Sequence, residues 1–204
     1  MVEPRSVRLV RRAGVGDLDA CASALGDAFA DYPWTRWTVD ARAHRRRIED
    51  LQGLALERLG LPFGQVWVGT VGRAVECAAI WMHSTVAIPA TVLDAIAAEQ
   101  RALEGDRHAA SQAAEAVVAP LRPEVAHWYL GAVGTRPRSQ RLGLAGAVLA
   151  PGLDAADSSR TPTFLETSSE SNVAFYESLG FEVAGEVALP DGGPHVWAML
   201  RAPR

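Results

Sequence analysis

The chain has 204 residues, of which 49% are hydrophobic and 22% are charged, and this length and balance suit one compact domain with a substantial core. Its formal net charge of −4 argues against a nucleic-acid-binding protein, and two cysteines with five scattered histidines give no zinc-ligand spacing, so we expect no metal site. Apolar runs stay well short of the ~20 residues of a membrane span, and the N-terminus lacks the apolar core of a signal peptide, so we expect a cytoplasmic protein that contacts no membrane.

The first part of the chain predicts one strand and two helices. Residues 7–10 are expected to form the strand, and apolar side chains at helical spacing predict an amphipathic helix over 17–30. That helix should stop before Pro33, because the residue preceding a proline avoids helical backbone. A second helix is predicted over 41–59, and the glycine and proline that follow it should end it.

The middle of the chain predicts a hairpin and a long helical stretch. Residues 65–71 and 74–83 are rich in β-branched and aromatic residues and are separated by a short turn, which favours two antiparallel strands. An alanine-rich stretch over 90–119 predicts helix, broken near Gly105.

The segment from 128 to 181 carries the most information about function. It predicts a strand, a loop, a helix, a strand and a short helix, at 128–135, 136–145, 146–157, 163–169 and 172–180. Two closing strands are predicted at 182–189 and 195–201. No linker or repeat marks a second domain, so we expect residues 1–204 to form a single α/β domain, with a mixed sheet and helices on both faces.

The loop over 133–145 joins a buried strand to the N-terminus of a helix. Unpaired N–H groups and the helix dipole favour an anion at such a place. Gly143 would allow close approach of a phosphate, and Arg136, Arg138 and Arg141 would add cationic donors. Taken alone, the loop fits an ordinary strand-to-helix connection with exposed arginines equally well.

A dinucleotide site is a weaker interpretation of the same loop. Glu166 follows Gly146 by the spacing of a ribose-binding acid, but Arg141 stands where the first glycine of G-x-G-x-x-G should be. Too little chain follows for a full nucleotide-binding sheet. We therefore set this interpretation aside.

Two short motifs point to a family. Residues 140–145 (QRLGLA) fit an acyl-CoA loop pattern, Q/R-x-x-G-x-G/A, and FLET, the asparagine, FYE and GF within 164–181 match a second conserved block. In this order and spacing the chain resembles the GNAT family of acetyl-CoA-dependent N-acetyltransferases. The resemblance implies a mainly antiparallel sheet of about seven strands, split by a V-shaped splay between the two central strands, with the CoA-binding core at about 128–181.

The resemblance also implies which residues contact acetyl-CoA as cosubstrate. They are Ala132, Val133, Gly134, Arg138, Gln140, Arg141, Leu142, Gly143, Leu144, Ala145 and Asn172. The amide of Val133 would polarise the thioester carbonyl, and Asn172 would either contact the CoA arm or cap its helix. The loop departs from the usual glycine-rich form at Arg141, Leu142 and Ala145, which could weaken the affinity for CoA.

The resemblance assigns the chemistry to two residues and implies direct transfer in a ternary complex. Tyr176 matches the general acid that protonates the departing thiolate. Glu166 and Asp31 are candidate bases for the amine, a water chain is an alternative, and Glu166 could instead only hold the ammonium group. Cys21 and Cys77 are expected to be core residues rather than acyl-enzyme nucleophiles.

An aromatic cluster in the chain marks the predicted acceptor site. Asp31, Tyr32, Trp34 and Trp37 follow the first helix, where the family builds its acceptor pocket; a hydrophobic staple over the core is the alternative. Similar short pieces along nearly the whole chain point to family members that protect against aminonucleoside antibiotics. We therefore expect a small-molecule primary amine as acceptor, and a monomer or homodimer. Acetylation of protein or peptide amines and a non-catalytic acyl-CoA-binding module are the alternatives.

Overall fold

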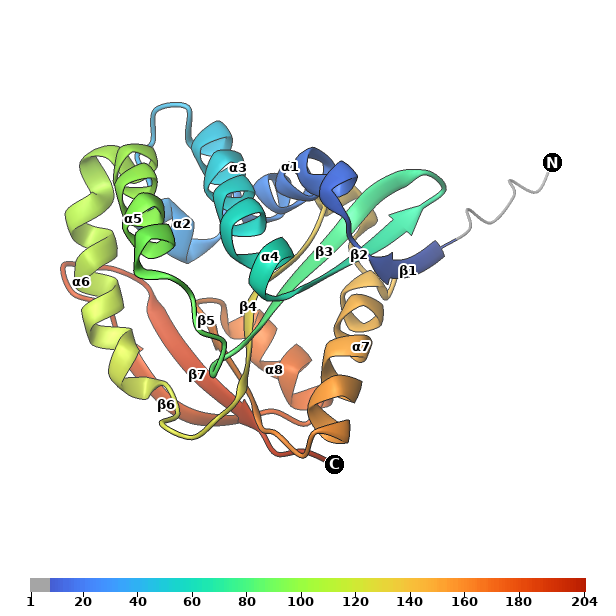
Figure 1. Cartoon of the computed structure of the whole chain (residues 1–204). Coiled ribbons are helices and arrows are strands. Elements are labelled where there is room, and N and C mark those ends of the chain that lie inside the picture. Colours follow the sequence, from blue (N-terminus) through green and yellow to red (C-terminus); the bar gives the residue numbers. More distant parts are fainter. Residues whose placement is uncertain (1–7) are drawn as a thin grey trace.

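A computed structural model describes residues 8–204 and shows one seven-stranded sheet wrapped by helices (Figure 1). The strand order is β1-β2-β3-β4-β5-β7-β6. The strands are β1 (Arg8–Arg12), β2 (Gln65–Val71), β3 (Ala74–His83), β4 (Trp128–Thr135), β5 (Thr163–Thr167), β6 (Glu182–Ala188) and β7 (His195–Arg201). The helices are α1 (Leu18–Phe29), α2 (Pro33–Thr38), α3 (His44–Ala55), α4 (Leu61–Phe63), α5 (Ala90–Glu104), α6 (His108–Val118), α7 (Leu144–Ser158) and α8 (Glu170–Ser178).

The sheet divides between β4 and β5, as the sequence predicted. All other neighbouring strands are antiparallel, whereas β4 and β5 are parallel and pair only at Trp128–Thr163 and Tyr129–Phe164. Beyond Tyr129 the two strands separate. The edge of β4 that faces β5 therefore keeps backbone donors and acceptors without a strand partner, which favours an extended ligand at this edge.

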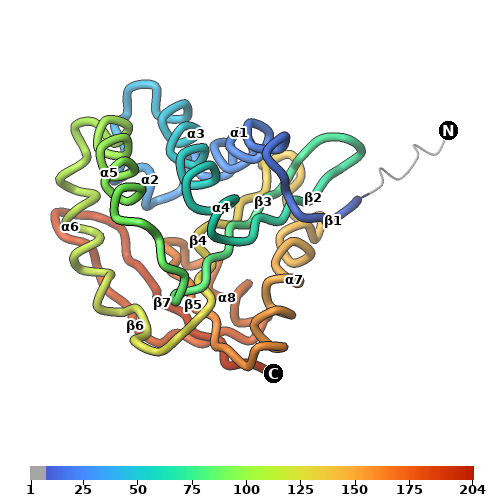
Figure 2. The backbone as a smooth tube through the Cα atoms, viewed as in Figure 1, coloured from blue at the N-terminus to red at the C-terminus, as the bar shows by residue number. Residues whose placement is uncertain are grey.

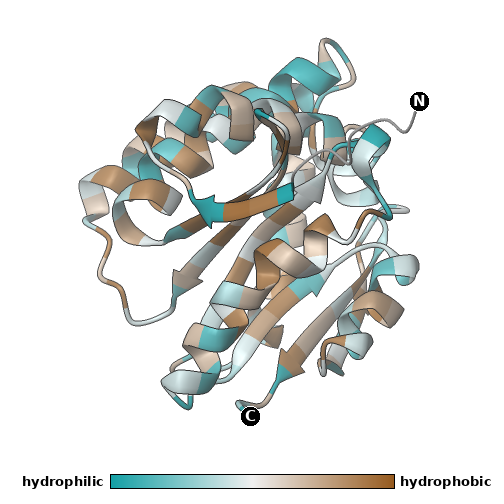
Figure 3. Cartoon of the chain, turned by 90° about the vertical axis from the view of Figure 1, so that its right-hand side faces the viewer, coloured by the Kyte–Doolittle hydropathy of each residue, from teal (hydrophilic) through white to brown (hydrophobic). Residues whose placement is uncertain are grey.

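The core lies on both faces of the central strands. Alternate residues of β3 point to opposite faces: Ala78 and Ile80 pack with Leu25 of α1, whereas Ala79 and Trp81 pack with α7. Figure 3 shows apolar segments along the central strands, flanked by helices in which apolar and polar residues alternate. The helices are therefore amphipathic in sequence, and β3 is apolar on both faces except at Glu76 and at its last residue, His83.

Most predicted elements are confirmed within one or two residues, including the break at Gly105, where φ is +60°. Val7, the predicted start of the first strand, lies outside the described residues. The strand predicted over 163–169 ends at Thr167, and the following helix begins at Glu170 rather than at residue 172.

The predicted end of the second helix is wrong. Gly60 keeps helical backbone, and a widened turn over Leu56–Gly60 leads directly into α4. Pro62 lies in the first turn of α4, where its missing N–H costs no hydrogen bond. Pro33 likewise begins α2 instead of only ending α1.

The segment over 84–127 makes a long excursion between two adjacent strands. β3 and β4 pair antiparallel, so a short turn could join them. Instead the chain passes through α5 and α6 before it returns to β4, as the backbone trace shows (Figure 2). Within the described residues, no helix is both long enough and apolar enough to cross a lipid bilayer.

Candidate active site

Two cavities meet where β4 and β5 separate. The first, which we call the loop groove, has a volume of about 700 Å³ and lies between α1, the loop over 135–146 and α8. The second, the inner cavity, has a volume of about 240 Å³ and lies deeper, between β4, β5, α2 and α3. Both cavities are lined by Phe29, Tyr32, Val133, Asn172 and Tyr176. The two cavities are therefore adjacent at these five residues, and molecules bound in them would lie close together there.

The loop groove is built where β4 runs into the N-terminus of α7. Gly143 has a φ of +79° and precedes the first helical residue, Leu144. At both Gly143 and Gly146, no protein atom lies within 4 Å of the position that a Cβ would take, so the space beside them belongs to the groove. Free N–H groups at the start of a helix, next to such open space, suit a pyrophosphate.

Most residues predicted to contact CoA line the two cavities. Ala132 lines the inner cavity, Val133 lines both, and the others that line the loop groove are Gly134, Gln140, Arg141, Gly143, Leu144 and Ala145. Position 134 requires glycine for packing as well, because a Cβ there would lie only 2.7 Å from Cβ of Ala28 on α1. Arg141 has a φ of +59°, which explains why a glycine suits this position better.

Arg138 and Leu142 are not among the residues that line the groove. Arg138 donates to both carboxylate oxygens of Glu76, from Nε at 3.0 Å and from Nη2 at 2.5 Å, and Ser139 Oγ donates to the same carboxylate at 2.8 Å. These hydrogen bonds, led by that of Arg138, lower the pKa of Glu76 despite its burial. Arg138 thus anchors the loop to β3 instead of pointing at a ligand, because a buried carboxylate requires a cationic partner.

Arg136 anchors the same loop to α1. It forms an ion pair with Asp27, and its backbone N–H donates to the Glu76 carbonyl at 2.8 Å. Of the three arginines that the sequence offered for a phosphate, only Arg141 lines the groove. The charge available to an anion therefore comes from one guanidinium and the backbone of α7.

Tyr176 lies in the wall that the two cavities share. Its side chain comes from the second turn of α8 and is 6% exposed, packed against Phe175 and Phe181. Burial, with a smaller contribution from Tyr32, raises its pKa, so the phenol stays protonated. Among the described residues no hydrogen-bond partner of its hydroxyl is found, which leaves this donor free for a ligand.

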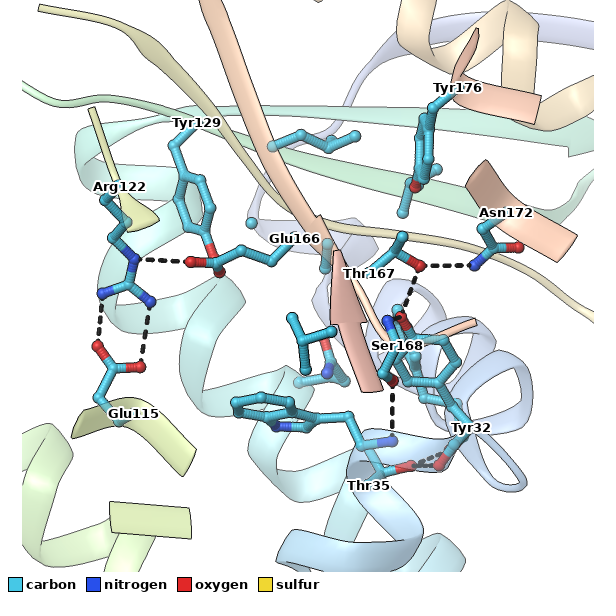
Figure 4. Close-up of a pocket in the computed structure, with 18 residues that line it drawn as sticks. Tyr32, Thr35, Glu115, Arg122, Tyr129, Glu166, Thr167, Ser168, Asn172 and Tyr176 are labelled. Carbon is cyan, nitrogen blue, oxygen red and sulfur yellow. Dashed lines mark hydrogen bonds and ion pairs between the residues drawn. The ribbon is translucent and has the colours of Figure 1, made fainter. Parts of the chain in front are cut away.

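Tyr32 joins α2 to the end of β5. Its hydroxyl lies 2.9 Å from Thr167 Oγ1 and accepts a 2.6 Å hydrogen bond from the backbone N–H of Ser168. Asn172 donates to Thr167 Oγ1 at 3.2 Å, and the backbone N–H of Trp34 donates to Ser168 Oγ at 3.1 Å. Asn172 does not cap α8, whose N-cap residue is Ser169. These hydrogen bonds hold the start of α2, the end of β5 and Asn172 of α8 together beside the two cavities (Figure 4).

Glu166 lies in the inner cavity, held on both carboxylate oxygens. Arg122 Nε donates to Oε1 at 2.9 Å and the Tyr129 hydroxyl donates to Oε2 at 2.9 Å. Arg122 also pairs with Glu115 through Nη1 at 2.5 Å and Nη2 at 3.1 Å. Figure 4 shows this charged group on one side of the cavity, facing Tyr176 and Asn172 on the other. Glu166 therefore presents a carboxylate of fixed orientation in the lining of the inner cavity.

Sequence reasoning missed Arg122, Glu115 and Tyr129 as site residues. Arg122 follows α6 directly, in a segment without secondary-structure periodicity, and Glu115 reads as an ordinary exposed helix residue. Tyr129 offered a signal, because the predicted strand 128–135 lies beside the strand of Glu166. The long excursion between β3 and β4 brings Arg122 and Glu115 to this place.

The predicted acceptor residues are divided by the structure. Tyr32 and Trp34 line the inner cavity, whereas Asp31 is exposed and lines the loop groove. Trp37 lines neither cavity: it packs beside the apolar cluster of α6 and β7, and its ring lies 5.1 Å from the Arg107 guanidinium. Trp34 packs against the same apolar cluster, and of the two tryptophans only Trp34 also lines the inner cavity. In the part of the chain that is described, no group of three or more His, Cys, Asp or Glu could hold a metal ion.

Solved structures of acetyltransferases share this fold. A histone acetyltransferase HPA2-related acetyltransferase from Corynebacterium glutamicum superposes with a TM-score of 0.71 at 21% identity, covering 97% of both chains. The polyamine N-acetyltransferase of Drosophila melanogaster gives 0.61 at 14% identity, covering 96% of this chain and 100% of the other. A putative GNAT-family acetyltransferase from Desulfovibrio desulfuricans gives 0.56 at 14%, covering 96% and 99%. No family model matches the sequence. At these identities the likeness establishes the GNAT fold, and the activity has to be argued from the site.

Proposed function

We propose that the chain is an N-acetyltransferase that moves acetyl from acetyl-CoA to a primary amine of a small molecule. The observation that carries this proposal is that two cavities share Tyr176 in their lining, next to the place where strands β4 and β5 separate. One cavity suits a long anionic donor and the other suits an amine. A residue that can donate a proton lies where they meet.

The loop groove would bind acetyl-CoA as a substrate. The pyrophosphate would lie against the N-terminus of α7, beside Gly143 and Arg141. The pantetheine amides would pair with the free edge of β4, and the Val133 N–H would stabilise negative charge on the thioester oxygen. Val133 supports this role because it lines both cavities.

In the inner cavity, Glu166 would orient the acceptor. Both its oxygens already accept hydrogen bonds, so we assign it to holding the ammonium group, with water carrying the amine proton away. The nitrogen lone pair then forms the C–N bond to the thioester carbon as the C–S bond breaks. Tyr176 donates a hydrogen bond and a proton to the departing thiolate, and the raised pKa keeps it protonated at neutral pH.

The walls of the inner cavity support a proposed class of acceptor. Tyr32, Trp34 and Tyr129 provide aromatic surface, which suits a flat or partly apolar amine. Short pieces of the sequence, among them AFADYP at 28–33, LETS at 165–168 and NVAFYESLGFEV at 172–183, are similar to puromycin N-acetyltransferase. We therefore propose an aminonucleoside or related antibiotic as the first acceptor to test, with resistance or self-protection as the role.

The test is acetyl-CoA-dependent release of free thiol, with puromycin as acceptor and a blank without acceptor. Release well above the blank supports both the donor and the acceptor class. Acetyl-CoA binding without release turns the search to other small amines and to peptides with free N-termini. If acetyl-CoA does not bind, or if binding occurs and no amine or peptide is ever acetylated, the enzyme proposal is overturned.

A further inference from the structure

A second groove continues from the inner cavity between the helices. It has a volume of about 730 Å³ and lies between α2, α3, α5 and α6; we call it the helical groove. It shares four lining residues with the inner cavity: Trp34, Thr35, Gln52 and Glu115. The two spaces are therefore adjacent at these four residues, and a molecule seated at Glu166 that extends past Trp34 and Gln52 would enter the helical groove.

The excursion over 84–127 forms one side of this groove. Since β3 and β4 are antiparallel neighbours, closing the sheet requires no helices between them. α5 and α6 nevertheless pack beside α3 and α2 and turn Ile96, Gln100 and Glu115 toward the space between the helices. Residues of this segment line the helical groove, and none of the residues that line the loop groove belongs to it.

The lining of the helical groove combines apolar side chains with polar ones, among them the two carboxylates of Glu104 and Glu115. Leu51, Leu59 and Ile96 supply apolar surface. The buried carboxylate of Glu104 accepts from Gln100 Nε2 at 2.7 Å and Ser111 Oγ at 2.6 Å, and lies 2.6 Å from His108 Nδ1. No lysine or arginine is among the described residues that line the groove. An anionic group there would meet the carboxylates of Glu104 and Glu115; the cation that pairs with Glu115, Arg122, does not line the groove.

We propose that the helical groove holds the distal arm of an elongated amine acceptor, and that this arm is apolar and ends in a neutral or cationic group. This inference rests on the proposed acetyltransferase function and refines its substrate class. The arm gains from burial of its apolar surface. The terminal group is selected by the acidic lining, which disfavours a carboxylate or phosphate.

The experiment uses four alkyl amines that share one reacting group. Propylamine is short, octylamine has a long apolar arm, diaminooctane ends in an ammonium group, and aminooctanoate ends in a carboxylate. With wild type we expect octylamine and diaminooctane to exceed propylamine in kcat/KM by at least about tenfold, and aminooctanoate to be the poorest of the long amines. Equal kcat/KM for all four overturns the inference.

Two variants obstruct the groove without disturbing the core. Ala97 and Ala116 are exposed and line the groove from α5 and α6, so Ala97→Trp and Ala116→Trp should fold and fill it. We expect KM to rise by at least about tenfold for octylamine and diaminooctane, with the kinetics of propylamine unchanged. Ala95→Trp is the matched control, since Ala95 is exposed on α5 and is not among the groove-lining residues.

A substitution that adds a positive charge to the groove distinguishes a preference for the length of the amine from a preference for its terminal group. Gln112 is exposed and lines the groove, and Gln112→Lys should lower kcat/KM for diaminooctane while raising it for aminooctanoate. Unchanged kinetics for both amines would overturn the claim about the terminal group. If short amines are acetylated and the tryptophan variants leave long amines unaffected, this inference fails alone; if no amine is acetylated, the proposed function fails with it.

Discussion

The loop groove and the inner cavity meet at one tyrosine, yet they are constructed in opposite ways. The loop groove takes its anion-binding part from one continuous stretch, 133–146, and uses backbone N–H groups and left-handed backbone at Arg141 and Gly143. The inner cavity takes its charged residues from α6, β5 and the segment after α6, which are distant in the sequence. The loop groove therefore depends mainly on residues close together in the sequence, whereas the inner cavity depends on tertiary packing of distant segments.

Charged side chains also serve different purposes in the two regions. Beside the loop groove, Arg136 and Arg138 are used to fasten the loop to Asp27 and Glu76. In the inner cavity, Arg122 and Glu166 face the space that a ligand would enter. The loop groove is thus shaped mainly by backbone geometry, whereas the inner cavity presents charged side chains to its interior.

The largest expected effect comes from a substitution at Tyr176, which lines both cavities. Tyr176→Phe should lower kcat by at least about tenfold, because the departing thiolate loses its proton donor. The dissociation constant of acetyl-CoA and the thermal stability should stay close to wild type, since the hydroxyl has no partner among the described residues. Steady-state kinetics, calorimetric titration of acetyl-CoA and thermal unfolding check this. Undiminished turnover would remove Tyr176 from the mechanism.

The next effect belongs to the inner cavity. Arg122→Gln should lower kcat/KM for the amine by about tenfold, because Glu166 loses one of its two orienting hydrogen bonds. Acetyl-CoA binding, which depends on the loop groove, should not change. Glu115→Gln is the matched control, because it touches Arg122 from an exposed position without contacting Glu166. A weaker affinity for acetyl-CoA in the Arg122 variant would contradict the separation of the two regions.

A smaller effect is expected from loosening the loop groove. Glu76→Gln should raise KM for acetyl-CoA by roughly threefold to tenfold with kcat nearly kept, since the anchor of Arg138 and Ser139 is weakened. KM for the amine is the internal control and should not move.

The same substitution gives a prediction for pH. The pKa of Glu76 is lowered in the folded state from its ordinary value of 4.5, so its stabilising effect is complete above that value and is lost as the pH falls through the lowered pKa. The difference in unfolding free energy between wild type and Glu76→Gln should therefore be largest at neutral pH and vanish in acid. A difference that persists unchanged in acid would show that Glu76 does not act through its charge.

The smallest effect concerns backbone strain at Arg141. Left-handed backbone costs a residue with a side chain about 1–2 kcal/mol. Glycine removes this cost, but its greater conformational entropy in the unfolded chain offsets part of the gain. Arg141→Gly should therefore raise the unfolding free energy by less than about 1 kcal/mol, while the loss of the guanidinium weakens acetyl-CoA binding. Arg141→Lys keeps both the strain and the charge and should leave both quantities near wild type. Chemical denaturation and titration of acetyl-CoA distinguish the two variants.

The elements of this fold were predictable wherever a short-range signal dominates. Strand 74–83 was identified with its correct bounds because it is apolar on both faces apart from Glu76 and His83. Gly105 was identified as a break because glycine disfavours helix interiors, and it has a positive φ in the structure. The end predicted at Gly60 was wrong, because Pro62 lies in a helical turn; the stop before Pro33 was correct, but the helix that Pro33 begins was not predicted. A proline ends one helix or begins the next according to the packing around it, and the sequence alone gives both signals.

By itself, the sequence determined the order of strands and helices, the anion-suited loop before α7 and the placement of Tyr176 on a short helix, because each depends on neighbours within a few residues. Tertiary structure alone decided that Arg138 anchors the loop to Glu76, that Trp37 packs away from the cavity, and that Arg122 and Glu115 complete it. The physical reason is that an ion pair or a cavity wall requires side chains from segments far apart in the chain. Which of those segments meet is settled only when the sheet opens between β4 and β5 and the excursion over 84–127 packs against it.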